Sequence, residues 1–196
     1  MKILYIIVLS ILLVLIESNT SQADDASPEQ GTQLVLLGTG TPNADPERFG
    51  PALAIVVNDT PYLVDFGPGI VRRAAAAHEN GVTGLQVSKL ATAFLTHLHS
   101  DHTTGYPDLI YTPWVLEREV PLKVFGPEGL ADMTRHMQAA YQLDVEVRLN
   151  GLEPINKEGY KVEAVEIEPG VIFQDENVKV TAFHVPHGSW KPAFGY

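Results

Sequence analysis

The chain of 196 residues contains no cysteine. This absence excludes disulfide bonds, a lipid attached to cysteine, and thiolate ligands for a metal. Basic residues are also few, with 13 Lys and Arg against 24 Asp and Glu, which gives a net charge of −11. Such a surface repels polyanions, so the composition argues against long nucleic acid as a partner unless a local basic patch or bound metal overrides the average.

No apolar run is long enough to span a bilayer. The run from Ile3 to Ile16 has about 14 residues, against the roughly 20 that a membrane helix needs. It follows Lys2 and precedes a polar segment that ends in small residues at Ala23, which is typical of a secretory signal peptide. We therefore predict export to the periplasm or the medium, with cleavage after Ala23 and no stable membrane span afterwards. An uncleaved anchor is the alternative.

The rest of the chain has no internal repeat and no low-complexity linker. Residues 24–32 are polar and contain a proline, so we expect a disordered mature N-terminus. Residues 33–196 are enough for one domain with an ordinary core. The order of apolar runs, turns and helical segments predicts an α/β fold with a mixed sheet and a hairpin near its start. The expected strands are 33–37, 52–57, 62–64, 91–95, 122–125, 162–167 and 178–183, and the expected helices are 70–79, part of 104–116, and a segment from about 130 to 141.

Four side chains that bind metals occur within six positions after the predicted strand 91–95: His97, His99, Asp101 and His102. Residues two apart in an extended segment point the same way, so His97 and His99 can bind one ion together. A turn just after them would bring Asp101 and His102 toward a second ion. Nitrogen and oxygen ligands without thiolate favour zinc, with iron and manganese as alternatives. The segment predicts a metal site, whereas the alternative is a polar loop with scattered histidines.

A catalytic zinc typically has three protein ligands and an open fourth position. His187 follows a predicted strand in a turn and is the candidate third ligand for the first ion, while His184 competes for this role. His78 and His136 fall in predicted helices and are expected to be ordinary histidines. Asp65 has two interpretations, either a turn residue after a strand or a hydrogen-bond acceptor for a ligand histidine.

The segment HLHSDH at 97–102 resembles the HxHxDH signature of the metallo-β-lactamase superfamily. Other segments are similar to its ribonuclease Z and arylsulfatase-like branch, although glycine segments alone would indicate only tight turns. These segments are LGTGTP (37–42), VDFGPG (64–69), FGPEGL (125–130) and VPHGSWKPAFGY (185–196). The resemblance implies a metallo-β-lactamase-like αββα sandwich, of which residues 33–196 would supply the N-terminal half to two thirds.

The resemblance also implies a ligand set. His97, His99 and His187 would bind the first of two zinc ions, and Asp101 and His102 would contribute to the second. A bridging aspartate and a last histidine are expected beyond the printed sequence. Asp101 would be the catalytic residue that orients the attacking water, so no serine or cysteine nucleophile is needed.

Three functions follow as alternatives. The main prediction is an exported hydrolase that uses a metal-activated water on a small phosphodiester or aryl sulfate ester, with that small anionic ester as its partner and a homodimer as one arrangement. The second is a ribonuclease Z-like endonuclease that processes tRNA 3′ ends. The predicted export argues against this function, because tRNA is cytosolic. The sequence also lacks a cluster of Lys and Arg that could bind RNA. The third is an inactive, truncated fragment that binds metal.

Overall fold

The computed structural model describes residues 31–152 and 155–196. The predicted signal peptide lies outside the described residues, and so do positions 24–30 of the segment predicted to be disordered. Thr32 is already part of the first strand, which therefore begins one residue before the predicted strand and domain boundary at residue 33. No helix in the described part is long and apolar enough to cross a membrane.

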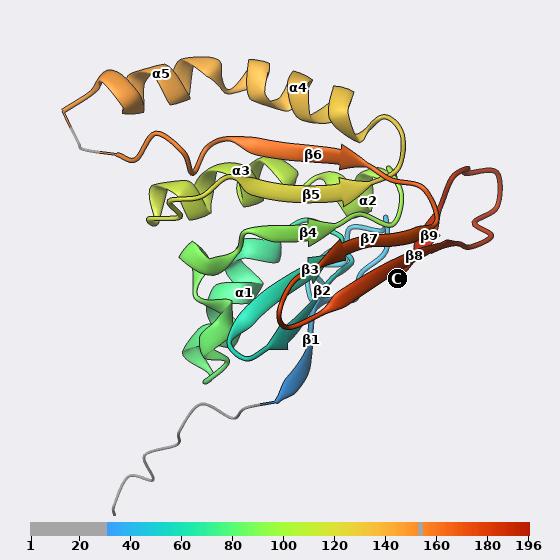
Figure 1. Cartoon of the computed structure of the whole chain (residues 1–196). Coiled ribbons are helices and arrows are strands. Elements are labelled where there is room, and N and C mark those ends of the chain that lie inside the picture. The colour runs from blue at the N-terminus through green and yellow to red at the C-terminus, as the bar shows by residue number, and fades with distance from the viewer. Residues whose placement is uncertain (1–30, 153–154) are drawn as a thin grey trace, which may run out of the picture.

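The elements of the described residues are named in Figure 1. The strands are β1 (Thr32–Gly38), β2 (Ala52–Val57), β3 (Thr60–Val64), β4 (Thr92–Phe94), β5 (Leu122–Gly126), β6 (Val162–Glu166), β7 (Gly170–Gln174), β8 (Lys179–His184) and β9 (Phe194–Gly195). The α-helices are α1 (Ile70–Glu79), α2 (Ser100–Thr103), α3 (Tyr106–Val115), α4 (Leu130–Ala140) and α5 (Gln142–Asn150), and short 3-10 helices span η1 (Thr83–Leu85) and η2 (Val87–Lys89).

The larger sheet is mixed, as predicted. Its strands lie in the order β1-β2-β3-β4-β5-β6, with antiparallel pairing from β1 to β3 and parallel pairing from β3 to β6. A smaller antiparallel sheet contains β7, β8 and β9. Because β3, β4 and β5 are parallel, their carboxyl ends meet at one edge, and the loops that leave them lie close together.

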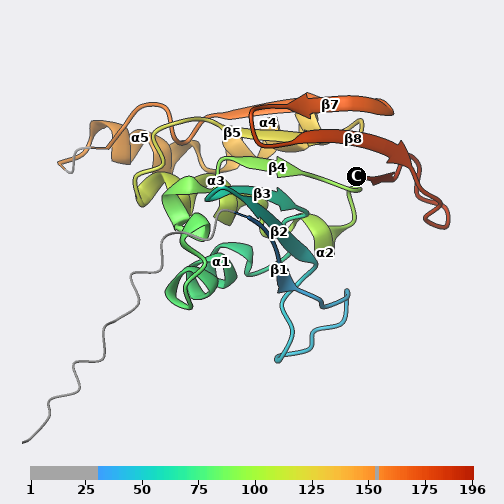
Figure 2. The same ribbon diagram turned by 60° about the horizontal axis from the view of Figure 1, so that its bottom comes forward.

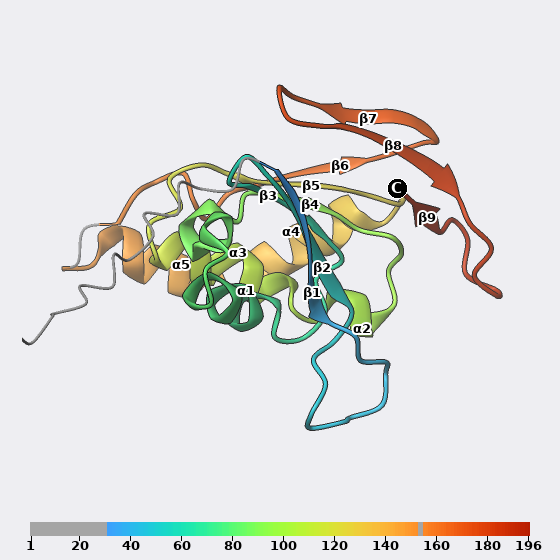
Figure 3. The ribbon, with the colours of Figure 1, turned by 90° about the horizontal axis from the view of Figure 1, so that it is seen from below.

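The described residues form three successive layers (Figures 2 and 3). The helices α1, α3 and α4 cover one face of the larger sheet, and the smaller sheet covers part of the other. One core lies between helices and sheet and contains Leu63, Ala93 and Trp114, which are fully buried. A second core lies between the two sheets and contains Phe94, Phe125 and Phe194. The alternation along β4 thus sends neighbouring side chains into different cores.

The predicted hairpin at 52–64 is confirmed. Strands β2 and β3 pair with Val57 opposite Thr60, so that two residues form the turn. These are Asn58 and Asp59, with φ angles of 47° and 65°. Asparagine and aspartate tolerate this left-handed conformation better than other residues with side chains, and it matches the twist of the two strands.

Several elements were not predicted from the sequence, namely α2, the two 3-10 helices, α5 and β7. Helix α5 follows α4 after the single residue Tyr141, where the prediction ended the helical segment without a successor. Strand β7 pairs with β8 in the smaller sheet. The predicted helix in 104–116 is confirmed as α3, which contains Pro107 in its first turn and Pro113 in its interior.

Candidate metal centre

The histidine segment leaves the carboxyl end of β4. Residues 95–99 lie outside regular secondary structure, with a bend at Thr96, and α2 begins at Ser100, directly after His99. The end of β3 fixes this segment, because the backbone N–H of Phe66 donates to the carbonyl of His102 at 2.9 Å. Close packing here requires glycine. A Cβ on Gly67 would lie 2.6 Å from the carbonyl oxygen of Asp101, which explains part of the VDFGPG segment.

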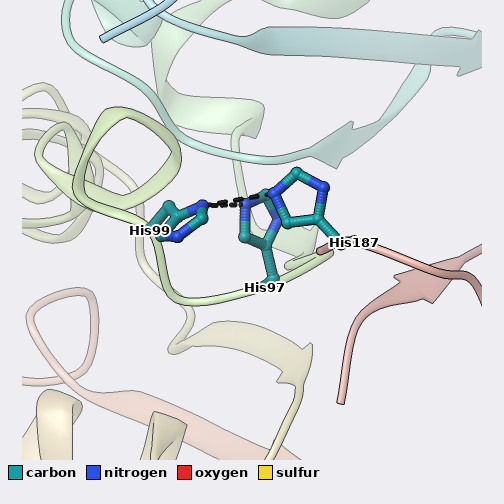
Figure 4. A group of neighbouring side chains, drawn as sticks. All are labelled: His97, His99 and His187. Atoms are coloured by element: carbon teal, nitrogen blue, oxygen red, sulfur yellow. Dashed lines mark hydrogen bonds between the residues drawn. The ribbon is translucent and has the colours of Figure 1, made fainter. Parts of the chain in front are cut away.

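Three imidazoles converge in Figure 4. Ligand nitrogens of His97, His99 and His187 all lie within 4.8 Å of one another. His97 Nε2 is 2.9 Å from His99 Nδ1, and His187 Nε2 is 3.3 Å from the same atom. Nitrogen lone pairs that face one another at such distances repel unless a proton or a cation lies between them. Three nitrogen donors of this kind fit a divalent metal with a fourth position for water.

Burial favours the neutral, metal-binding form of His97. Its pKa is lowered to about 4, mainly because burial disfavours the charged ring and also because the charges of His102 and His187 oppose protonation. His97 therefore offers a lone pair at neutral pH, as a metal ligand must.

Asp101 and His102 lie beside the three histidines. The ring centroid of His102 is 4.2 Å from that of His97, and His102 Nε2 is 3.7 Å from Asp101 Oδ2. Burial lowers the pKa of His102, but the hydrogen bond and charge of Asp65, together with the charge of Asp101, outweigh it and raise the pKa. The imidazole nitrogen and the carboxylate oxygen, 3.7 Å apart, are donors of the kinds that a second ion could use.

Asp65 orients two of these rings. Its carboxylate accepts a hydrogen bond from His102 Nδ1 at 2.7 Å, and it also accepts from the backbone N–H and the hydroxyl of Thr96. The hydroxyl of Thr96 is 2.9 Å from His97 Nδ1. If Nδ1 carries the proton on both rings, Nε2 of both is left free for metal. The buried Asp65 has a φ of 58°, so both sequence interpretations apply, since it is a turn residue and a hydrogen-bond acceptor.

His184 is not part of the cluster, although it was the competing candidate. It is the last residue of β8, and its backbone pairs with Phe194 of β9. Its ring packs on the Phe194 ring with centroids 5.1 Å apart. His187 lies three residues further, in the turn that folds back over the histidine segment. His78 and His136 lie in α1 and α4, as predicted.

Two neighbours of the cluster were not found from the sequence. Thr96 connects Asp65 to His97, and its position directly before the first histidine was the only available signal. Trp190 lies with its ring centroid 4.5 Å from that of His99. It belongs to the late segment that resembled the superfamily, but nothing in its spacing indicated a contact with the metal loop.

Comparison with known proteins identifies the class. A family model described as the beta-lactamase superfamily domain matches residues 60–196, and the chain belongs to this superfamily. The resemblance drawn from HLHSDH and the predicted metallo-β-lactamase-like α/β fold are therefore confirmed.

The curated relatives with similar sequences are ribonucleases Z. The chain is 34% identical over 166 residues to a ribonuclease Z of Mycobacterium sp. (strain KMS), which covers 84% of this chain and 56% of the relative. It is 32% identical over 167 residues to the ribonuclease Z of Mycobacterium marinum, covering 84% and 57%. The chain thus spans somewhat more than half the length of the curated relatives it matches.

Solved structures support the fold. The short form of human tRNase Z aligns with a TM-score of 0.62 at 23% identity, covering 82% of this chain and 61% of that one. The metallo-beta-lactamase fold protein YhfI from Bacillus subtilis aligns with a TM-score of 0.57 at 15% identity, covering 83% and 56%.

These relatives overturn the main functional prediction. An exported hydrolase of a small phosphodiester or aryl sulfate ester is wrong as the principal interpretation, because the curated relatives are ribonucleases Z. The second alternative agrees better with this finding. The main prediction relied on a predicted signal peptide and on average charge, and neither feature describes the metal centre itself.

Proposed function

We propose that this chain provides the metal centre of a ribonuclease Z-type endonuclease that hydrolyses a phosphodiester bond at the 3′ end of precursor tRNA. The observation that carries the proposal is the convergence of His97, His99 and His187 in a chain 34% identical to a ribonuclease Z. RNA replaces the small ester as the proposed partner. A homodimer remains a prediction.

The donor set favours zinc among the divalent metals. His97, His99 and His187 would hold one ion, and Asp101 and His102 would contribute to a second. When bound, such ions act as Lewis acids and lower the pKa of water.

The remaining work falls to residues of the chain. Asp101 would orient the attacking water and accept its proton while the oxygen bonds to phosphorus and the bond to the leaving oxygen breaks. Asp65 would keep the rings of His97 and His102 in place through the hydrogen bonds described above.

A cavity beside the metal loop supports a long substrate. It has a volume of about 490 Å³ and is bordered by Asp101 and by the loop that contains Arg48 and Phe49. The guanidinium of Arg73 lies 5.2 Å over the Phe49 ring, and Arg48 and Phe49 are exposed. Arginine and an aromatic ring together suit RNA, through phosphate contact and stacking, even though Asp45 lies 3.5 Å from Arg48. The fold thus brings Arg48 and Arg73, which are distant in the sequence, to one loop beside Asp101.

The test is a cleavage assay, after metal analysis, on the purified full-length protein, including any coding sequence that extends the printed residues. Zinc-loaded protein is expected to cut precursor tRNA in preference to bis-aryl phosphodiester and aryl sulfate. His99→Ala should abolish cleavage, whereas His136→Ala, a matched change on the exposed face of α4, should not. Stoichiometric metal without cleavage of RNA would contradict the proposal and favour the alternative of a metal-binding protein without turnover.

A further inference from the structure

Trp190 is fixed to the turn that carries the third histidine. The backbone N–H of Trp190 donates to the carbonyl of His187 at 3.0 Å, and the two residues pair as an isolated antiparallel bridge. Gly188 has a φ of 56°, which a residue without a side chain adopts at no steric cost. The tight turn therefore places the indole and the imidazole in a set relation to each other.

The Trp190 ring forms a wall of the metal centre. Its centroid lies 4.5 Å from that of His99, with the planes at 60°, and 6.2 Å from that of His97, with the planes at 68°. The side chain is half-buried. Trp114, the other tryptophan of the chain, is fully buried, and its indole N–H donates to the carbonyl of Asn156 at 2.9 Å. Trp114 is thus part of the core, whereas Trp190 is partly open to solvent beside the histidines.

A partly exposed indole ring beside the three histidines is placed to contact a molecule bound at the metal centre. Aromatic side chains bind single-stranded nucleic acid by stacking on bases, and they tolerate any sequence because every base has a π-face. A phosphodiester held at His97, His99 and His187 would place a neighbouring base within reach of the ring that already contacts His99.

We propose that Trp190 is the stacking platform for the nucleobase next to the scissile phosphodiester, and that it determines the preference of the centre for nucleotide over small ester substrates. This inference rests on the proposed ribonuclease function and adds to it a specificity-determining residue. A purely structural role, in which Trp190 only supports His99, is the competing explanation.

The first experiment compares precursor tRNA with the same RNA made abasic at each nucleotide that flanks the cleavage site. For intact RNA, Trp190→Ala is expected to lower kcat/KM about tenfold or more, while Trp190→Phe keeps most of it. For RNA abasic at the stacked position, wild type and Trp190→Ala should be cleaved equally well. An equal loss on intact and abasic RNA, accompanied by loss of bound metal, would overturn the inference and leave only the structural role.

The second experiment measures binding without turnover. In Trp114→Phe the only indole is Trp190, and its fluorescence is expected to be quenched by a short single-stranded RNA added to chelator-treated protein. In Trp190→Phe the remaining signal comes from the buried Trp114 and should not respond. A response of Trp114 alone, or none from Trp190, would overturn the inference.

The two proposals fail separately. RNA cleavage that is indifferent to the base and to Trp190 would refute the stacking role and leave the ribonuclease function intact. Absence of RNA cleavage together with quenching of Trp190 would refute the ribonuclease function and retain Trp190 as a base-binding residue.

Discussion

At the scale of single residues, the orientation of the metal-facing rings depends on one carboxylate. Asp65 reaches Thr96 and His102, which are 31 and 37 positions later in the chain. Its left-handed backbone is a conformation that asparagine also adopts readily. Asp65 can therefore be changed to asparagine without a steric penalty, which separates its charge from its role in the turn.

We expect Asp65→Asn to weaken metal affinity about 10- to 100-fold, the usual effect of removing a carboxylate behind a ligand histidine. The melting temperature of the metal-free protein should change little. Affinity is measured by competition with a chromogenic chelator. Asp59→Asn is the matched control, since Asp59 also has a positive φ, of 65°, but lies in the β2–β3 turn. Unchanged affinity in Asp65→Asn would show that the hydrogen bonds do not tune the centre.

The choice between the two late histidines gives a second prediction. His187→Ala removes one of three converging nitrogens and should lower the bound metal of the purified protein by at least half. His184→Ala removes a ring that packs on Phe194 and should leave the metal content unchanged. Elemental analysis of the two variants measures this difference. The opposite pattern would show that the turn after β8 moves when metal binds.

The residues of the site were predictable where sequence spacing determines geometry. The two-residue spacing of His97 and His99 predicted that both would face one ion, and their ring nitrogens lie 2.9 Å apart. His187 lies 88 residues after His99, and it was selected over His184 only because it was expected in a turn. The contacts of Asp65 and Trp190 arise from strand pairing and from a turn between distant segments, which no local pattern encodes.

At the scale of elements, α3 contains a proline in its interior, and an arginine beyond the end of the helix replaces the hydrogen-bond donor that this proline lacks. Pro113 has no N–H, so the carbonyl of Leu109 lacks its helical donor. Arg118 Nη1 donates to that carbonyl at 2.9 Å, and the fully buried guanidinium also donates to the carbonyls of Leu90, Ile110 and Gly159. Burial lowers its pKa to about 10, yet the group stays charged at neutral pH. One side chain thus joins α3 to two neighbouring loops.

Replacing Arg118 by methionine should lower the free energy of unfolding by about 3 kcal/mol or more, because several buried carbonyls lose their donor at once. Urea denaturation measures the change. Arg135→Met on the exposed face of α4 should cost at most about 0.5 kcal/mol. The cost of Arg118→Met should shrink in a Pro113→Ala background, where the helix recovers its own donor. Equal costs in both backgrounds would contradict this account.

Elements with a clear period or a clear end were predictable. The alanine-rich α1 ends at Glu79, directly before Asn80 and Gly81, as the sequence indicated. Helix α5 was missed because only Tyr141 separates it from α4, with no glycine or proline to mark a new start. Strand β7 is a short run whose register is set by pairing with β8 rather than by its own pattern.

At the scale of the whole molecule, the net charge of −11 and the proposed RNA substrate oppose each other. The net charge predicts repulsion of RNA at long range, but binding at a particular surface depends on the charges of the residues that form it. Arg48 borders the cavity next to Asp101, and Arg73 lies over Phe49 at the same end of the molecule. These arginines are separated by 25 positions in sequence, so no basic run marked the place where the fold brings them to one loop.

This arrangement predicts how binding responds to salt. Arg48→Ala should weaken binding of precursor tRNA and reduce the slope of log K against log salt by about 0.7, the value for one contact with single-stranded phosphate. Filter binding at salt concentrations from roughly 50 to 200 mM measures this slope. Arg135→Ala is the control, because it removes the same charge from α4 and should leave the slope unchanged. Equal slopes in the two variants would mean that RNA approaches the metal centre by another surface, since the overall charge of both proteins is identical.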